Sequence, residues 1–161
     1  MKTLSNIVAW VSRVLHSVAG IALTAIVVLT GADVVLRYFG RPIVGTYEIV
    51  ALLGALVAGF ALPQTQRVQG HVLMDFIITR LPSGLQKLLY VITRLLGIFV
   101  FGLIGREVWL LGDGYRRLGE GSLTLAIPLF PVAYVIAACS FVVIVVLFLE
   151  IVEGKKEEAE Q

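Results

Sequence analysis

The sequence predicts an all-α integral membrane protein with four transmembrane helices and short interfacial amphipathic helices. Of its 161 residues, 58% are hydrophobic and the mean hydropathy is +0.95, whereas a soluble domain is usually about 45–50% apolar. The apolar excess lies in four long blocks separated by short charged stretches. Because about 20 apolar residues are needed to cross roughly 30 Å of hydrocarbon, this distribution indicates membrane spans.

The first span is expected over residues 14–36. Its uncharged run over residues 14–32 has 19 members, whereas the apolar region of a secretory signal peptide has about 7–15. We therefore interpret it as a retained span. The apolar residues before it have helical spacing, which fits either an interfacial amphipathic helix or an earlier start of the span itself.

A tight turn leads to a second span over residues 47–66. Pro42 and Gly45 mark the turn, Thr46 can cap the next helix, and Glu48 lies in its first turn. Small residues in this span recur at intervals of three or four positions: Ala51, Gly54, Ala55, Ala58 and Gly59. Such residues let helix backbones approach closely in lipid, so we expect this span to be buried against other helices.

The third span is predicted over residues 86–111, with a short surface helix over residues 72–81 before it, ended by Pro82. Ser83 and Gln86 have the spacing of a capping box that opens the span. A polar, glycine-rich connection over residues 112–126 follows. The fourth span, over residues 128–150, completes a domain of residues 1–152, and residues 153–161 form a charged cytoplasmic tail that is disordered or a frayed helix end.

Two arginines interrupt the third span. Only 11 residues lie between Arg94 and Arg106, and they would cover roughly 16 Å as a helix. Either both arginines snorkel to opposite interfaces, or they face protein partners. Glu107 adjoins Arg106 and is not expected to pair with it across one helix face.

Lysine and arginine are more frequent on one side of the predicted spans. With the amino terminus inside, eight lie in cytoplasmic segments: Lys2, Arg13, Arg67, Arg80, Lys87, Arg94, Lys155 and Lys156. Five lie in outer segments: Arg37, Arg41, Arg106, Arg116 and Arg117. Because cytoplasmic loops carry the excess of positive charge, both termini are predicted to be cytoplasmic.

The chemistry-bearing residues do not form an enzyme site. Cys139 is the sole cysteine, so no intrachain disulfide or thiolate cluster can form. His16 lies early in a span and His71 in a connection, which does not suit a bis-histidine haem. A net charge of +2 gives no indication of nucleic-acid binding. We therefore expect no catalytic residue, no metal and no cofactor.

The ionisable residues near the spans lie close to span ends. Asp33 and Arg37 stand four residues apart on one helical face, where an ion pair is expected, and Glu48 could join them across the short turn. A self-sufficient ion-coupled transporter normally has interrupted helices or polar sites at mid-membrane. The centres of these spans carry almost no charged residues, which favours an accessory subunit whose transport chemistry lies in another chain.

Three ordered motifs resemble the small membrane subunit of TRAP transporters, the DctQ-type family. Residues 33–48 (DVVLRYFGRPIVGTYE) resemble its first-loop signature, and residues 67–75 (RVQGHVLMD) followed by Leu81-Pro82 resemble its second-loop motif. Residues 125–128 (LAIP) followed by Tyr134 resemble the entry to its fourth span. The likeness extends from about residue 10 to about residue 150.

The resemblance implies a scaffold role in a sodium-driven importer of organic acids. Its expected partners are a large polytopic membrane subunit that carries the substrate and sodium sites, a periplasmic substrate-binding protein, and membrane lipids. The motif positions give the expected interface residues. The outer surface would be ordered by Arg37, Arg41 and Glu48, with Asp33 at the start of the same motif, and the cytoplasmic connection by Arg67, Gly70, His71 and Asp75. Contacts with the large subunit would come from Gly54, Ala58, Arg94 and Arg106.

Two other functions remain open from the residues alone. His16 and the four-helix size fit a membrane anchor for a redox enzyme. Glu48 or Asp33 could serve as the proton carrier of a small self-assembling exporter. A purified protein without haem absorption would argue against a haem-binding redox anchor. The exporter hypothesis predicts proton flux from the isolated chain.

Overall fold

The computed structural model describes residues 2–69 and 83–157, and its regular secondary structure there is helical. The helices are α1 (Lys2–Tyr38), α2 (Thr46–Gln69), α4 (Ser83–Leu118) and α5 (Phe130–Glu157). All four are long and apolar enough to cross a membrane, which confirms the predicted all-α fold with four candidate membrane spans. The surface helix predicted over residues 72–81 lies outside the described residues.

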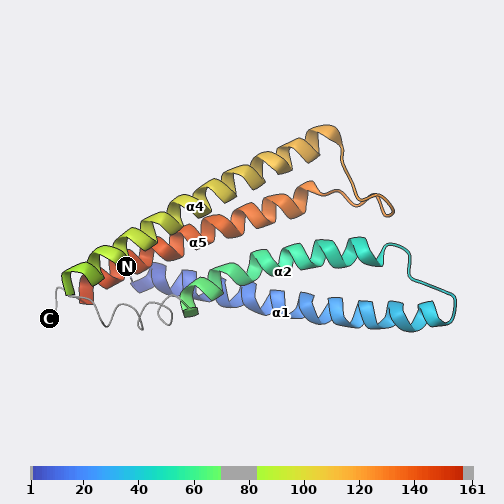
Figure 1. Ribbon diagram of the computed structural model, residues 1–161, viewed down its shortest axis with the longest axis horizontal. Helices are drawn as coiled ribbons and strands as arrows, with labels where there is room; N and C mark the ends of the chain where they lie inside the picture. The colour runs from blue at the N-terminus through green and yellow to red at the C-terminus, as the bar shows by residue number, and fades with distance from the viewer. Residues whose placement is uncertain (1, 70–82, 158–161) are drawn as a thin grey trace.

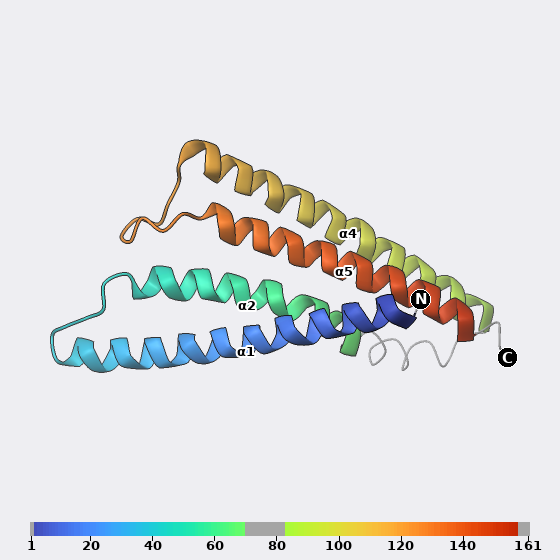
Figure 2. The same cartoon turned by 180° about the vertical axis from the view of Figure 1, so that it is seen from behind.

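The four helices form two antiparallel hairpins, α1 with α2 and α4 with α5 (Figure 1). Figures 1 and 2 show the hairpins close together at one end and spread apart at the other. The terminal end contains Lys2, Gln69, Ser83 and Glu157, and the loop end contains Tyr38, Thr46, Leu118 and Phe130. The antiparallel order puts the first and last described residues at the same end.

Helix α5 is the central helix, because it packs against α4 on one side and α2 on the other. In its apolar window 39% of the residues are buried, against 11% in α1 and 11% in α4. Ala137, Val143 and Leu147 of α5 are almost fully buried. Gly59 of α2 permits this approach, since a Cβ there would lie 3.3 Å from Ile136 Cγ1.

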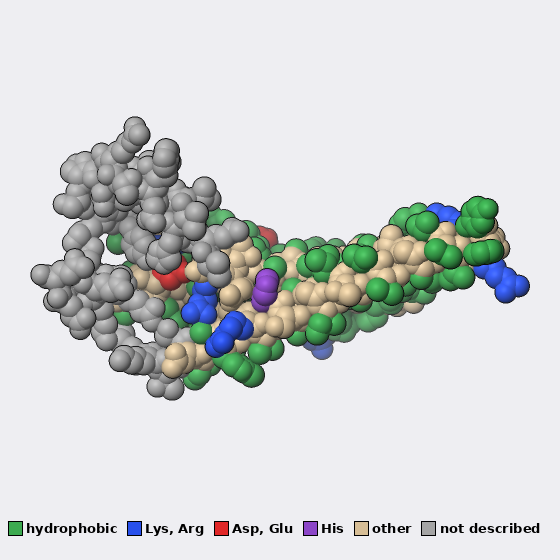
Figure 3. All heavy atoms as spheres, turned by 90° about the horizontal axis from the view of Figure 1, so that it is seen from below, with side chains coloured by type: hydrophobic (Ala, Val, Ile, Leu, Met, Phe, Trp, Pro, Cys, Tyr) green, Lys and Arg blue, Asp and Glu red, His purple; other side chains and the backbone are tan. Residues whose placement is uncertain are grey.

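The outer helices expose most of their apolar side chains. Figure 3 shows hydrophobic side chains along the length of one face, with Lys and Arg side chains mainly towards the two ends. With 37 and 36 residues, α1 and α4 are each roughly 55 Å long, which exceeds the roughly 30 Å of hydrocarbon. These faces need lipid or another protein to cover them.

Three predicted boundaries change. Helix α1 runs unbroken from Lys2 and its candidate span begins at Asn6, which agrees with the earlier start of the first span and not with a separate interfacial helix. Helix α4 starts at Ser83, as the capping box indicated, but it continues to Leu118. Gly112, the first residue of the predicted connection, lies within α4 and packs closely on α5. Helix α5 likewise continues through Glu157 into the predicted tail.

Gly112 offers a test of the α4–α5 packing. A Cβ at Gly112 would lie 2.9 Å from Tyr134 Cε1 and 3.3 Å from Ala133 Cβ. We expect Gly112→Ala to destabilise the isolated chain by about 1–3 kcal/mol through overpacking, measured by unfolding in detergent. Gly102→Ala is the matched control, because a Cβ at Gly102 meets no atom within 4 Å. Equal stabilities of the two variants would contradict this packing.

Candidate functional site

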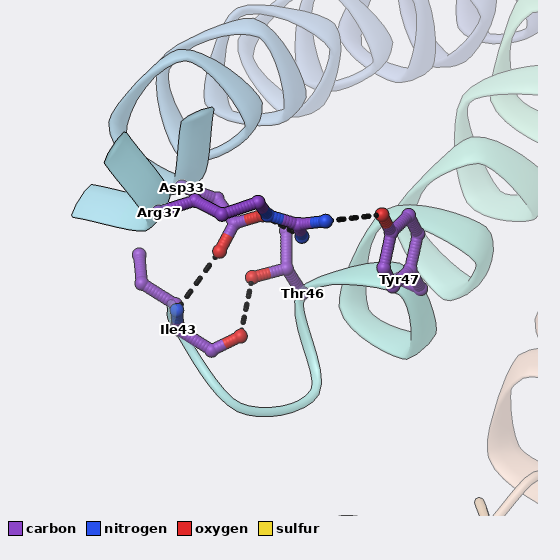
Figure 4. A network of polar contacts seen from close by, with 5 residues as sticks. All are labelled: Asp33, Arg37, Ile43, Thr46 and Tyr47. Carbon is purple, nitrogen blue, oxygen red and sulfur yellow. Dashed lines mark hydrogen bonds and ion pairs between the residues drawn. The ribbon is translucent and has the colours of Figure 1, made fainter. Parts of the chain in front are cut away.

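A polar network ties α1 to α2 at the loop end (Figure 4). The buried carboxylate of Asp33 accepts hydrogen bonds from Arg37 Nη2 at 2.6 Å and from the Ile43 backbone N–H at 2.8 Å. Arg37 Nη1 donates to the Tyr47 hydroxyl at 3.0 Å. The Asp33–Arg37 pair expected from their spacing is therefore present, and it holds the α1–α2 turn by its backbone.

The turn sequence positions these groups. Gly40 has a φ of 73° just beyond the end of α1, and the N–H groups of Phe39 and Arg41 donate to Leu36 O, which is how a glycine commonly closes a helix. The predicted capping role of Thr46 is wrong. Its hydroxyl donates backwards to Ile43 O, while the first hydrogen bonds of α2 are accepted by the Gly45 carbonyl.

A half-open cavity of about 260 Å³ lies beside the network, between α1 and α2. Its walls are formed by Thr30, Asp33, Val34, Arg37, Thr46, Tyr47 and Val50. The Asp33 carboxylate is already occupied by a guanidinium and a backbone N–H. Since the charges of the pair oppose each other, the cavity wall is neutral overall, and the network acts chiefly to order the turn.

Glu48 connects the two hairpins. Its Oε1 accepts a hydrogen bond from the Thr124 N–H at 2.6 Å, and its Oε2 accepts one from the Leu125 N–H at 3.0 Å. The Ser122 side chain also lies next to this carboxylate. The suggestion that Glu48 joins Asp33 and Arg37 is thus wrong, because its side chain reaches the connection between α4 and α5.

The α1–α2 turn also approaches the α4–α5 connection closely at Gly45 and Leu125. Gly45 has a φ of 81°, and a Cβ there would lie 2.5 Å from Leu125 Cδ1. The chain at Leu125 is held by a compact turn in which Ala126 N–H donates to Ser122 O and Ser122 N–H donates to Ile127 O. We call Gly45, Glu48, Ser122, Thr124 and Leu125 the loop latch, since they join the spread ends of the hairpins.

Glu48→Ala tests the loop latch. Losing the carboxylate removes the acceptor of both backbone N–H groups, so we expect amide hydrogen exchange at Thr124 and Leu125 to rise by roughly tenfold or more. Glu120→Ala is the control, because Glu120 is an exposed acid of the same connection outside the latch. Unchanged exchange at Thr124 and Leu125 in the Glu48 variant would contradict the latch.

Arg94 lies inside this chain. Its Nε is 3.0 Å from Glu150 Oε2 of α5, and the two side chains are only 4% and 14% exposed. The Arg94 side chain therefore neither snorkels to the membrane interface nor faces a partner protein, which were the two alternatives expected from the sequence. Glu150 was missed as its partner because it was treated only as the last residue of the fourth span, with no contact predicted between that span and the third. The sequence feature that could have indicated this pair is an arginine in the third span and an acid at the end of the fourth, which antiparallel helices can bring to the same level.

Arg106 differs from Arg94, since it faces away from its own chain. Its guanidinium contacts the adjacent carboxylate of Glu107, contrary to the sequence expectation, and the side chains are 67% and 63% exposed. Flexible side chains allow this contact between neighbouring residues even though their Cβ atoms point to different sides of the helix.

The remaining predicted residues do not gather at one place. Arg41 is exposed in the α1–α2 turn, and Arg67 is half-buried near the end of α2. Gly54 is half-buried with open space beside it, and Ala58 is exposed. Both are therefore outside the α2–α5 seam that Gly59 forms. Gly70, His71 and Asp75 lie outside the described residues.

Two further polar contacts were not predicted from the sequence. One is the hydrogen bond from Arg37 to the Tyr47 hydroxyl. In the other, the Tyr134 hydroxyl donates to Asp113 Oδ1 at 2.6 Å and joins α5 to α4. Among residues 2–69 and 83–157, no three or more His, Cys, Asp or Glu side chains are grouped so that they could hold a metal ion.

The latch joins the first-loop motif to the motif before the fourth span. A comparison with protein families matches residues 26–156 to the DctQ component of tripartite ATP-independent periplasmic transporters. The chain belongs to the DctQ family. This matched stretch covers most of the chain, so the protein is a multi-pass membrane component of a TRAP transporter. Comparisons with curated proteins and with solved structures gave no match.

The matched residues include all of α2 and α4 and parts of α1 and α5. They also include the Asp33 network and the loop latch. The match begins at residue 26, so the first two thirds of α1 lie outside it. Members of this family work in an assembly with a large membrane subunit and a binding protein. Membership therefore implies partners in the membrane.

Proposed function

We propose that this chain is the small transmembrane subunit of a sodium-coupled, binding-protein-dependent TRAP transporter that imports organic acids across the bacterial inner membrane. The family match carries the proposal. Its task is to enlarge the rigid frame beside the large subunit, which holds the substrate and sodium sites. Both termini lie in the cytoplasm, so the terminal end is cytoplasmic and the loop end is periplasmic.

The arrangement of the helices supports a scaffold role. Among the described residues, the hairpins pack mainly through α2 and α5, and the outer helices leave broad apolar faces for other membrane components. The Asp33 network and the loop latch fix both connections at the loop end by their backbones. A fixed surface loses less conformational entropy when a partner binds.

The loop end also supports a docking role for the periplasmic binding protein. Its exposed hydrophobic side chains are Tyr38, Phe39, Val44, Tyr47, Leu118 and Leu123. Leu123 is fully exposed at the tip of the α4–α5 connection, next to residues that Glu48 holds in place. Aromatic and large apolar residues on a rigid loop are suited to a protein contact.

Reconstitution with omission of single components tests the proposal. Liposomes would contain this chain and the large subunit encoded beside it, with the binding protein and a labelled organic acid added outside under an inward sodium gradient. We expect uptake with all components and sodium, and background uptake when any one is left out. Uptake that persists without this chain, or that this chain performs alone, would contradict the proposal.

A further inference from the structure

The contacts between α4 and α5 set the depth of Arg106. Arg94 pairs with Glu150, and a Cβ at Gly97 would contact Leu147. A Cβ at Gly105 would lie 3.3 Å from Ser140 Cβ and 3.8 Å from Ala137 O. Because the helices are antiparallel, the next residue, Arg106, lies level with residues 137–140 of α5.

This level is the middle of the uncharged run of α5. Residues 130–149 of α5 carry no charge, and 20 helical residues cover roughly 30 Å, the thickness of the hydrocarbon core. Residues 137–140 are at the centre of that run, about 15 Å from either boundary. Arg106, which was expected from the sequence to lie in an outer segment, lies midway along α4 between Arg94 and Arg117. An arginine side chain is too short to snorkel over that distance.

The Arg106 side of α4 is not covered by the described residues, 2–69 and 83–157. Arg106 and Glu107 are 67% and 63% exposed, and Phe99 and Leu103, one to two turns earlier, are also exposed. A Cβ at Gly102, one turn before Arg106, would meet nothing within 4 Å. Charged groups at the bilayer centre are costly in lipid and almost always face protein or a water-filled cavity.

We propose that Phe99, Gly102, Leu103, Arg106 and Glu107 form the docking face of α4 for a transmembrane helix of the large subunit. That helix carries hydrogen-bonding or charged side chains at mid-membrane depth, with an acceptor for Arg106 and a donor for Glu107. Gly102 lets the two helix backbones approach closely beside this polar contact. The inference rests on the proposed function and adds where and by what chemistry the two subunits meet.

Co-purification of charge variants tests the docking face. The tagged chain is co-expressed with the large subunit, extracted in mild detergent, and the large subunit recovered per tagged chain is measured. We expect Arg106→Leu and Glu107→Leu to lower recovery by roughly tenfold. Arg117→Leu, which removes an exposed arginine from the last turn of α4, should leave recovery unchanged. Each isolated variant should unfold at or above the wild-type temperature, which separates lost docking from lost folding.

A photo-crosslinking residue in place of Leu103 provides the second measurement. We expect a covalent adduct with the large subunit. Wild-type recovery of the large subunit in Arg106→Leu, or adducts only with lipid or with a second copy of this chain, would overturn the docking face while leaving the proposed function intact. A wild-type chain that retains no large subunit would contradict the proposed function itself, and the docking face with it.

Discussion

Replacing Arg94 by leucine is expected to destabilise the isolated chain by about 3–5 kcal/mol. Arg94 and Glu150 are both buried between α4 and α5, with 4% and 14% of their side chains exposed. The variant removes the cation that faces Glu150 and leaves the carboxylate in a low-dielectric site. Breaking one side of a buried ion pair is more costly than replacing both sides.

The double variant Arg94→Leu/Glu150→Leu separates the pair from the packing of its side chains. We expect it to recover most of the lost stability, because two apolar residues of similar volume can replace a buried pair at little cost. The measurement is unfolding in mixed detergent micelles, followed by circular dichroism. Two single variants that each cost less than about 1 kcal/mol, as exposed pairs do, would show that the pair is solvated.

Gly45→Ala is expected to cost about 2–5 kcal/mol and to loosen the loop latch. A residue with a Cβ resists the φ of 81° by about 1–2 kcal/mol. The new Cβ would also lie 2.5 Å from two atoms of the Leu125 side chain, so Leu125 must shift. Overpacking of this kind adds about 1–3 kcal/mol.

Gly40→Ala is the control for the backbone cost alone. Gly40 has a φ of 73°, but a Cβ there meets nothing within 4 Å. The difference between the two variants therefore reports the clash with Leu125. Adding Leu125→Ala to Gly45→Ala should remove that difference. If Gly40→Ala and Gly45→Ala are equally destabilised from the outset, the close approach of Gly45 and Leu125 is not present in solution.

The spans could be predicted from sequence because hydropathy acts locally along the chain. Four apolar blocks give four helices, and the Asp33–Arg37 pair follows from helical spacing within one element. The ends of α4 and α5 were predicted less well. The glycines after residue 111 suggested a connection, but α4 continues through Gly112, which packs on Tyr134, and α5 continues past Glu150, which pairs with Arg94.

The contacts between residues far apart in the sequence could not be predicted from the spacing of residues along the chain. Glu48 is 76 residues from Thr124, and no local pattern indicates that the two connections meet. Arg94 and Arg106 look equivalent in sequence, yet one is paired inside the chain and the other is exposed. That difference depends on which face of α4 packs on α5, and the glycines at 97, 105 and 112, which contact α5, decide it.

The most direct test of the subunit assignment is co-purification from native membranes. This chain would be tagged at its own chromosomal position, extracted gently and analysed by native mass spectrometry. The account predicts a complex with a much larger polytopic protein at a fixed ratio, with both encoded beside a periplasmic binding protein. Recovery of this chain only as a monomer or as an oligomer of itself would contradict that assignment.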